Sequence, residues 1–479
     1  MESPSGYKKN GNRKGSHELI PSSALLFNSQ LNPVEIVNLI SKQQYMQKVQ
    51  FLSYLFFTCL LIAYSFFATA AAENVGSQQY HNKVYVDNIK TVQLHVKGLE
   101  LSYPVIELGS REELIFSFDD LDGDVKNYQY TIIHCNADWT RSSLFPSDYM
   151  DGFYENPLDN YQLSFNTFVS YTHYSLTIPG YDLGLKLPGN YIVKVFEDFD
   201  QDNVVLTKRF MIAESRVQIQ AHVHRPRLTR FHQTGQQISI NIHHPELQVA
   251  NPHSELLVTV MKNGRHDNIL KDIKPTYIRS SEIVYEHDNQ MVFNAGNEYR
   301  NFDTKSLRYQ TEFIRNVEFS EGFYHIELQP ARSRGYARYF SHHDINGRFL
   351  IRNEEGRDPS TDADYVMVYF TLPWDVPYDN GDVYVLGGLS DWNFYNRNRM
   401  TYNYESKAYE LSMLLKQGYY NYQFVFLEDS ASEADATPFE GSFFETENDY
   451  FIMVYHRLPG SRFDRLVGTQ QINSRRQTR

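Results

Sequence analysis

Two acidic stretches contain the residues best suited to bind a cation, Asp119 to Asp124 and Glu197 to Asp202. An EF-hand loop needs a glycine at its sixth position and a bidentate glutamate at its twelfth. Counted from Asp120, these positions hold Val125 and Thr131, and the second stretch also departs from the pattern. We therefore favour solvated hairpin turns over a calcium site at both places.

Histidines gather in the middle of the chain, where His222 and His224 share one face of a predicted strand. A metal site needs further ligands, and neither a cysteine nor a carboxylate joins these histidines at ligand spacing. Gly-x-Ser-x-Gly, His-Glu-x-x-His and P-loop strings are also missing from the sequence. The sequence therefore predicts no enzyme, no metal site and no cofactor. The clustered histidines are His222, His224, His232, His243, His244 and His253.

The least generic part of the chain runs from Tyr128 to Thr177. Two alternating apolar and polar runs, 128–134 and 171–178, bracket about 35 residues without a clear period, far more than an ordinary hairpin connection. An aromatic ring buries about 150 Å² or more when packed, so many rings are costly to leave in water. The loop either folds back on its own domain as a flap or presents rings to a partner. Its rings are Trp139, Phe145, Tyr149, Phe153, Tyr154, Tyr161 and Phe165, and the first five are our candidate partner contacts.

A second candidate surface combines basic and aromatic residues in an otherwise acidic chain. Arg and Tyr are favoured anchors at protein interfaces, but a solvated loop over a neighbouring domain fits such a segment equally well. The segment contains Arg332, Arg334, Tyr336, Arg338, Tyr339 and Phe340. We take Arg332, Arg334, Tyr336 and Arg338 as candidate partner contacts.

The elements that position these candidates are predicted to be strands. Hydrophobic residues make up 41% of the 479 residues, and the aromatic share of 15% is almost all Tyr and Phe, with three Trp. This usage is typical of β proteins, and the length suffices for several hydrophobic cores. The predicted fold class is all-β, with tandem immunoglobulin-like or early-set β-sandwich domains.

Runs of strand length and shifts in composition predict the domain boundaries. The segment 353–362 holds no apolar residue but Pro359, and the residues after 455 are polar and basic. The predicted parts are an N-terminal β-sandwich with the long aromatic loop (83–215), a middle β domain (216–352), a linker (353–362), a C-terminal early-set-like β-sandwich (363–455) and a basic flexible tail (456–479).

An uncharged apolar run at 51–72 ends in small residues, as a secretory signal peptide does. We place the signal peptide at 46–72, with cleavage near Ala72, and treat 1–45 as an untranslated or disordered extension because it is out of place before a signal. A retained signal anchor is the alternative, since the run is long enough to span a bilayer. No other segment of the sequence is long and apolar enough to span a bilayer as a helix, so we expect no stable membrane insertion after cleavage.

Cleavage leaves 45 − 6 = 39 basic and 58 − 3 = 55 acidic residues, a net charge of −16. This acidity argues against nucleic acid as a partner, because phosphate binding requires basic surfaces. Cys59 lies in the leader, so Cys135 is alone in the mature chain and no intrachain disulfide can form. We expect Cys135 to be a small buried hydrophobe.

Several short motifs follow one another along the chain, namely His134-Cys135-Asn136-Ala137-Asp138-Trp139, Tyr149-Met150-Asp151-Gly152-Phe153, Asn166-Thr167, Tyr171-x-x-Tyr174, Asp344-Ile345-Asn346-Gly347-Arg348-Phe349 and Ala363-Asp364-Tyr365-Val366. Together these motifs resemble those of type IX secretion system plug proteins. The resemblance spans Val84 to Tyr455. It implies a non-catalytic protein of the periplasm, associated with the inner face of the outer membrane. Its partner would be the translocon barrel, whose periplasmic opening it occludes to gate protein export.

The last predicted domain also resembles early-set and family 48 carbohydrate-binding sandwiches. Its Val383–Asn393 segment carries their Gly-x-x-x-x-Trp turn, which ends at Trp392, and Gly418–Phe424 looks like their penultimate strand. This resemblance keeps an alternative function open, glycan binding in the periplasm or at the cell surface through the C-terminal domain. In the competing interpretation Trp392 is a structural plug at the end of the sandwich.

Overall fold

The computed structural model describes residues 79–475, together with Ser41 and Met46. The predicted extension at 1–45 and the predicted signal peptide at 46–72 lie outside the described residues, apart from those two positions. The chain divides into two compact units, Met1–Gly76 and Ser77–Arg479, and all described strands belong to the second. Among the described residues, none of the helices has the length and apolar character needed to cross a membrane.

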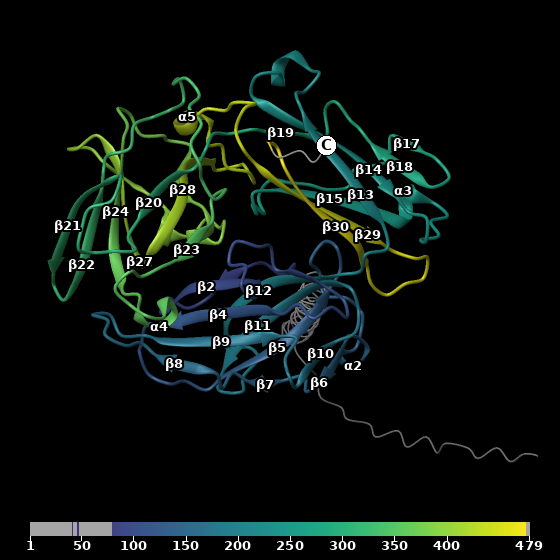
Figure 1. Cartoon of the computed structure of the whole chain (residues 1–479), viewed down its shortest axis with the longest axis horizontal. Helices are drawn as coiled ribbons and strands as arrows, with labels where there is room; N and C mark the ends of the chain where they lie inside the picture. The colour runs from purple at the N-terminus through teal and green to yellow at the C-terminus, as the bar shows by residue number, and fades with distance from the viewer. Residues whose placement is uncertain (1–40, 42–45, 47–78, 476–479) are drawn as a thin grey trace, which may run out of the picture. The chain divides into compact units, whose positions relative to one another are not determined.

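The first β-sandwich packs a six-stranded sheet against a four-stranded sheet (Figure 1). Apolar residues alternate along the strands, and their inward side chains, with Phe116, Phe118 and Tyr191 among them, form one core. The first sheet contains β1 (Lys83–Val84), β3 (Val105–Glu107), β5 (Tyr128–Cys135), β7 (Asn156–Pro157), β11 (Gly189–Glu197) and β12 (Val204–Ala213). The second contains β2 (Ile89–Val96), β4 (Leu114–Asp120), β8 (Tyr161–Leu163) and β9 (Thr172–Ile178). Outside both lie α2 (Pro146–Tyr149) and the pair β6 (Met150–Gly152) and β10 (Leu183–Leu185).

The second β-sandwich joins strands from the middle of the chain to strands from its end. Its core contains Ile240 and Val258 together with Ile452 and Val467. One sheet contains β13 (Gln218–His224), β14 (Gly235–His243), β17 (Tyr277–Ile278), β18 (Glu282–Tyr285) and β19 (Val292–Asn294). The other contains β15 (Leu256–Lys262), β16 (Ile269–Leu270), β29 (Asp449–His456) and β30 (Arg465–Asn473). The short helices α3 (Pro252–Glu255) and η1 (Thr229–Phe231) connect its strands.

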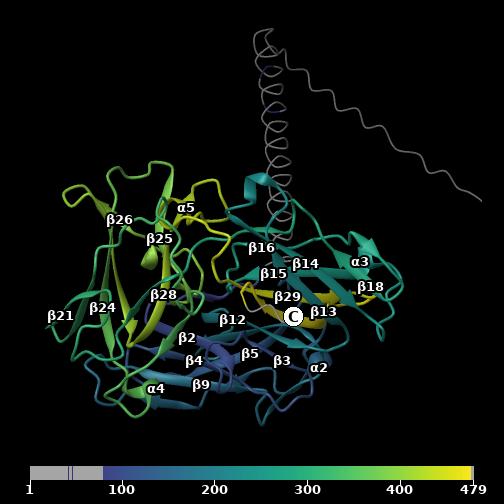
Figure 2. The same ribbon diagram turned by 45° about the horizontal axis from the view of Figure 1, so that its top comes forward.

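The third β-sandwich lies between those two groups of strands in the sequence, and Figure 2 shows its sheets from a second direction. One sheet contains β20 (Arg300–Asp303), β23 (Phe349–Ile351), β25 (Gly381–Leu386) and β28 (Gly418–Glu428). The other contains β21 (Ile314–Ser320), β22 (Phe323–Leu328), β24 (Tyr365–Pro373), β26 (Thr401–Asn403) and β27 (Ala408–Lys416). The connections form α4 (Pro359–Asp362), η2 (Gly388–Ser390), η3 (Asn396–Asn398) and α5 (Thr437–Glu440). The predicted all-β class with tandem β-sandwiches is confirmed.

Strand pairing crosses the boundary predicted between the middle and C-terminal domains. β20 pairs with β28, and β22 pairs in parallel with β24, so strands on both sides of residues 353–362 share one sandwich. The predicted linker instead connects β23 in one sheet to β24 in the other. Its polar composition belongs to tight turns, because Asp358 caps α4 and the Asp362 carboxylate accepts the backbone N–H of Arg357 at 2.8 Å.

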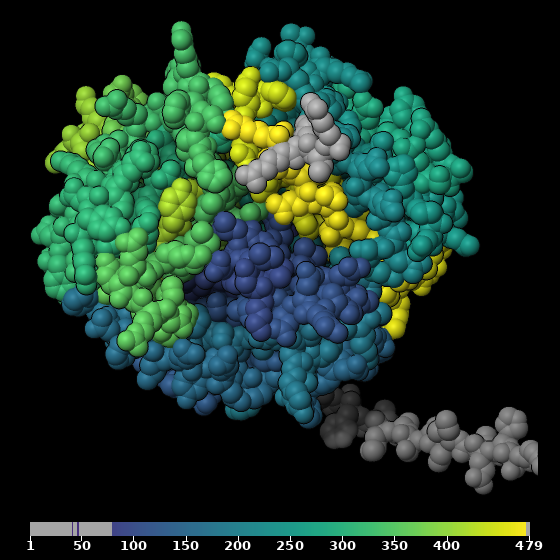
Figure 3. Space-filling view, in the orientation of Figure 1, coloured from purple at the N-terminus to yellow at the C-terminus, as the bar shows by residue number. Residues whose placement is uncertain are grey.

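The predicted flexible tail at 456–479 is wrong for residues 465–473. These residues form β30, which pairs antiparallel with β29, and Leu466 and Val467 are fully buried. In Figure 3 the C-terminal segment, in yellow, lies against residues from the middle of the chain, in teal. The polar residues that suggest a tail lie toward the end of this strand, where Gln470 and Gln471 are both exposed.

Leu466→Ala should destabilise the protein by about 2–5 kcal/mol, because it opens a cavity in a packed core. Leu458→Ala is the matched control, since Leu458 belongs to the same predicted tail but is exposed. Urea unfolding measures both changes. Equal and negligible effects of the two substitutions would contradict the assignment of β30 as a structural strand.

Candidate partner-binding surfaces and the junction behind them

The first and third sandwiches are joined by a buried ion pair. Asp119 on β4 accepts from the Lys416 ammonium at the end of β27, with Nζ and Oδ2 separated by 2.7 Å and both side chains 1% exposed. The Asp119 carboxylate also contacts His173 Nδ1 at 2.6 Å and accepts the Tyr365 hydroxyl at 2.7 Å. A buried ion pair is stable only when further hydrogen bonds satisfy its charges, and this one has them.

The pKa of the Asp119 carboxyl lies below its usual range. Burial alone would raise this pKa, but the Lys416 ammonium and the hydrogen-bonded His173 ring outweigh burial. Asp119 is therefore ionised at neutral pH. The first sandwich presents a fixed negative charge to the lysine of the third.

A second carboxylate of the same junction holds the end of the aromatic loop. Asp364, immediately before β24, accepts the backbone N–H of Phe168 at 2.8 Å and of Val169 at 3.0 Å. Beside it, the Tyr171 hydroxyl donates to the Ala363 carbonyl at 2.8 Å. We call Asp119, His173, Asp364, Tyr365 and Lys416 the junction. It anchors the loop end to the third sandwich through both side-chain and backbone groups.

Lys416→Met should cost about 3–5 kcal/mol of unfolding free energy, because it leaves the Asp119 carboxylate buried without its counter-charge. The double variant Asp119→Leu/Lys416→Met should cost less than the sum of the two single changes, since it removes both charges. Urea unfolding of the four proteins gives this coupling. Lys97→Met, which breaks an exposed ion pair with Glu113, serves as the control and should cost less than about 1 kcal/mol. Additive losses at Asp119 and Lys416 would contradict the coupling.

The aromatic loop is part flap and part exposed surface. Tyr149 is buried and donates its hydroxyl to the Ile132 carbonyl at 2.9 Å, while Trp139 is half-buried with the Arg209 guanidinium 4.4 Å above its ring. Tyr154 is also half-buried. By contrast, Phe145 is 68% exposed and Phe153 is 75% exposed. The structure therefore removes Tyr149 from the candidate contacts, because its ring belongs to the core of the first sandwich.

The predicted basic segment is also divided. Arg334 is anchored, since its guanidinium pairs with the buried Glu440 carboxylate at 2.6 Å. Arg332, Tyr336 and Arg338 are exposed. Next to them, the Tyr339 hydroxyl hydrogen-bonds to the buried Glu298. The segment is thus tied down at two points and presents the remaining side chains to solvent.

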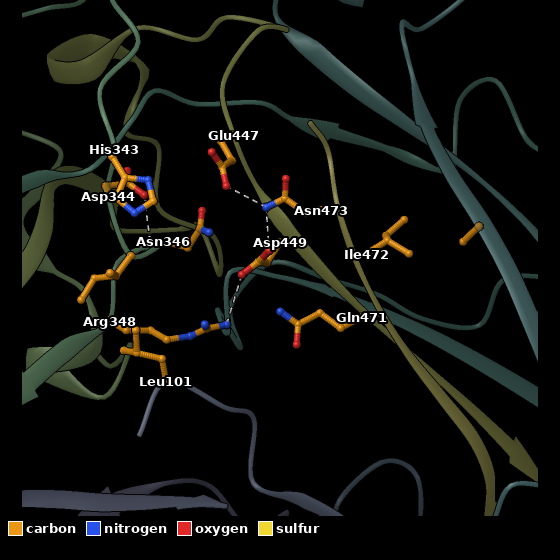
Figure 4. Close-up of a pocket in the computed structure, with 12 residues that line it drawn as sticks. Leu101, His343, Asp344, Asn346, Arg348, Glu447, Asp449, Gln471, Ile472 and Asn473 are labelled. Carbon is orange, nitrogen blue, oxygen red and sulfur yellow. Dashed lines mark hydrogen bonds and ion pairs between the residues drawn. The ribbon is translucent and has the colours of Figure 1, made fainter. Parts of the chain in front are cut away.

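A polar cavity of about 500 Å³ lies where segments of all three sandwiches meet (Figure 4). Several of its polar groups contact one another across the lining. The Asn473 amide donates to Glu447 at 3.0 Å and to Asp449 at 2.9 Å, and Arg348 lies 3.6 Å from Asp449. No group of three His, Cys, Asp or Glu side chains in the described part of the chain could hold a metal ion. We assign the cavity to the packing of the sandwiches.

His134 and Cys135 of the first motif are both interior residues. Cys135 is fully buried and unpaired, and burial raises the pKa of its thiol to about 12. The expectation of a small buried hydrophobe is confirmed. His134 packs against Tyr149 and Tyr191, its Nδ1 lies 3.0 Å from the Ser142 hydroxyl, and burial lowers its pKa to about 4.

His134 should make the folded state sensitive to acid. The pKa of His134 is about 4 in the folded protein and about 6.5 in the unfolded chain. Its contribution to the free energy of unfolding is therefore complete above pH 6.5 and is lost as the pH falls toward 4. The full loss corresponds to about 3 kcal/mol. His134→Gln should lack this part of the pH dependence. Urea unfolding of both proteins between these pH values measures the difference, and parallel stability curves would contradict it.

The sequence alone does not reveal the junction, although one pattern lies near it. The prediction of a solvated turn at residues 119–124 is wrong for Asp119 and Asp120, whose buried carboxylates end strand β4, so only Asp122 and Asp124 belong to the turn. Asp120 accepts from the Tyr128 hydroxyl at 2.9 Å. The alternation that defines β4 runs through Phe116 and Phe118, and it could have extended the strand to these two carboxylates.

Trp392 occupies the position expected of a structural plug. Its ring is 7% exposed and meets Tyr299 edge-on, with ring centroids 5.9 Å apart. Gly347, at a φ of +79°, approaches the indole so closely that a Cβ there would lie 2.3 Å from a ring carbon. A sugar platform must be exposed, so the glycan alternative loses the residue on which it depended.

Comparisons with known proteins agree with the motifs. Residues 89–214 match the family described as type 9 secretion system plug protein 1st domain. Among solved structures, the chain is similar to a hypothetical protein from Parabacteroides merdae ATCC 43184, with a TM-score of 0.80 and 36% identity over 83% of this chain and 100% of that one. A biofilm-associated protein domain, BSP, aligns at 6% identity and a TM-score of 0.17, covering 83% and 61%, which is too little for an argument. No curated protein matches the chain.

Fold, junction and surface together define an all-β protein of three joined sandwiches that displays aromatic and basic side chains. The chain belongs to the type IX secretion system plug protein family. This is not a known enzyme family. The family match covers the first sandwich, which carries the aromatic loop.

Proposed function

We propose that this protein is a non-catalytic plug that occludes the periplasmic opening of the type IX translocon barrel and so gates protein export. The observation that carries the proposal is the match of residues 89–214 to the plug family. In this proposal the protein is exported by the predicted signal peptide, resides in the periplasm and associates with the inner face of the outer membrane.

The junction supports a role as a stopper. A protein that closes an opening has to keep its shape against a flexible or moving rim. Domains that are connected only by linkers would not keep their relative positions in this way. Here Asp119, Lys416 and Asp364 join the first and third sandwiches through buried charged groups. The first and second are joined as well, since the Tyr455 hydroxyl donates to Asn190 at 2.8 Å and Asp464 accepts the backbone N–H of Ala137 at 2.9 Å.

The exposed rings of the aromatic loop are the proposed contacts with the barrel. Phe145 and Phe153 expose most of their surface to water, which costs free energy in the isolated protein. Burying these rings against a partner would be favourable. Trp139 and Tyr154, which are half-buried, would flank them, and Arg332, Tyr336 and Arg338 would supply polar contacts from the third sandwich. Because the chain as a whole is acidic, binding depends on local complementarity at these contacts.

The double variant Phe145→Ser/Phe153→Ser should leave the melting temperature nearly unchanged and weaken binding to the barrel at least tenfold, because both rings are exposed in the free protein. Phe199→Ser/Tyr404→Ser is the matched control, since these rings are 73% and 77% exposed and lie outside the loop. Co-purification with the barrel and entry of a large antibiotic into cells report binding and sealing. A double variant that still binds and seals like the control would remove the loop from the contact surface.

A further inference from the structure

A groove of about 1180 Å³ opens in the third sandwich beside the basic segment. It exceeds the roughly 300–1,000 Å³ of a typical small-molecule site, which suits a longer ligand. Its lining includes both strand β20 and the residues that follow β22. Six lining residues determine its character, namely Arg300, Phe313, Arg332, Arg334, Phe340 and His342.

Two of the arginines share a single carboxylate beneath the groove. Arg300 Nε donates to Glu440 Oε1 at 2.9 Å, and Arg334 Nε donates to Glu440 Oε2 at 2.8 Å. Burial acts to raise the pKa of Glu440, but the two guanidinium groups outweigh it and hold the pKa at about 2. One negative charge thus faces two positive charges.

The groove carries a net positive charge in an acidic protein. Arg332 has an exposed side chain with no ion pair to any residue of 79–475. Across the groove, Glu312 supplies the other negative charge. With neutral histidines the count is three arginines minus Glu312 and Glu440, or 3 − 2 = +1, against −13 for the whole chain. A ligand that prefers this place over the rest of the surface has to carry negative charge.

The walls of the groove suit an extended polypeptide. Phe313 and Phe340 are 40% and 77% exposed and offer apolar surface to a side chain. Strand β20 lies at the edge of its sheet in the described part of the chain, with β28 on its other side, and Arg300 and Asn301 of β20 line the groove. An extended segment can align with such an edge while guanidinium groups bind its carboxylates.

We propose that this groove binds an extended acidic peptide segment in which Asp or Glu alternates with an aromatic or aliphatic residue. Arg332 provides the free charge, Arg300 and Arg334 provide the positive floor, and the two phenylalanines receive the apolar side chain. The inference rests on the proposed function only for the source of the segment, which we assign to the translocon.

The test uses a fluorescein-labelled six-residue peptide in which Glu alternates with Phe or Val, and a second peptide with Gln in place of each Glu. Fluorescence anisotropy with the mature protein should show binding of the Glu peptide that weakens at about 1 M salt, where screening is short-ranged. Arg332→Glu should reduce its affinity at least tenfold. Arg111→Glu, at an exposed arginine of the first sandwich outside the groove and outside the proposed contacts, should change it less than threefold.

Equal affinity for the Gln peptide, equal losses in the Arg332 and Arg111 variants, or no binding of the Glu peptide would each overturn the proposal. Phe340→Ser gives a second check, since it should weaken binding without altering charge. Measuring how the same variants bind the barrel separates the groove proposal from the plug proposal. If wild-type protein seals the barrel but ignores the Glu peptide, the groove proposal fails and the plug proposal stands.

Discussion

One buried ion pair, between Asp119 and Lys416, fixes how the first sandwich meets the third. Taking two charges out of water is expensive, so the pair is stable only with its further partners, His173 and Tyr365, in place. The Ala363–Val366 motif supplies the third-sandwich half of the junction, and the Tyr171–Tyr174 motif supplies part of the first. Two of the six motifs therefore lie at the contact between the first and third sandwiches.

The alternation of apolar residues was enough to predict the fold class and most strands, because it is a local property of the chain. This alternation was not enough to predict which strands pair with one another, because pairing depends on residues far away in the sequence. β29 pairs with β15, from which it is separated by 188 to 200 positions in the sequence (450 − 262 and 456 − 256). β30 completes that sheet with a mixed pattern in which Leu466 is buried while Gln470 and Gln471 are at the surface. The prediction of a linker at 353–362 was wrong for a related reason. Polar residues in a turn within one sandwich have the same composition as a linker between two sandwiches.

Candidate contacts could be predicted as a class but not one by one. An aromatic excess in a long loop shows that rings must either pack or bind, and both outcomes occur within twenty residues: Tyr149 completes a core, whereas Phe153 remains in solvent. The basic segment divides in the same way, because Arg334 forms an ion pair with the buried Glu440 and Arg332 does not. Such differences depend on a neighbour contributed by a distant strand, which spacing alone does not reveal.

The order of strands along the chain bears on how the protein is made. A polypeptide released from its N-terminus onward can close the first sandwich as soon as residues 83–213 have emerged, and the third from residues 300–428. The second cannot close until β29 and β30 arrive, since both pair within its sheet. Until then the β15 edge lies open to other strands, the state in which chains aggregate. The second sandwich is therefore completed only after the strands of the whole third sandwich have been synthesised, when β29 and β30 become available to pair.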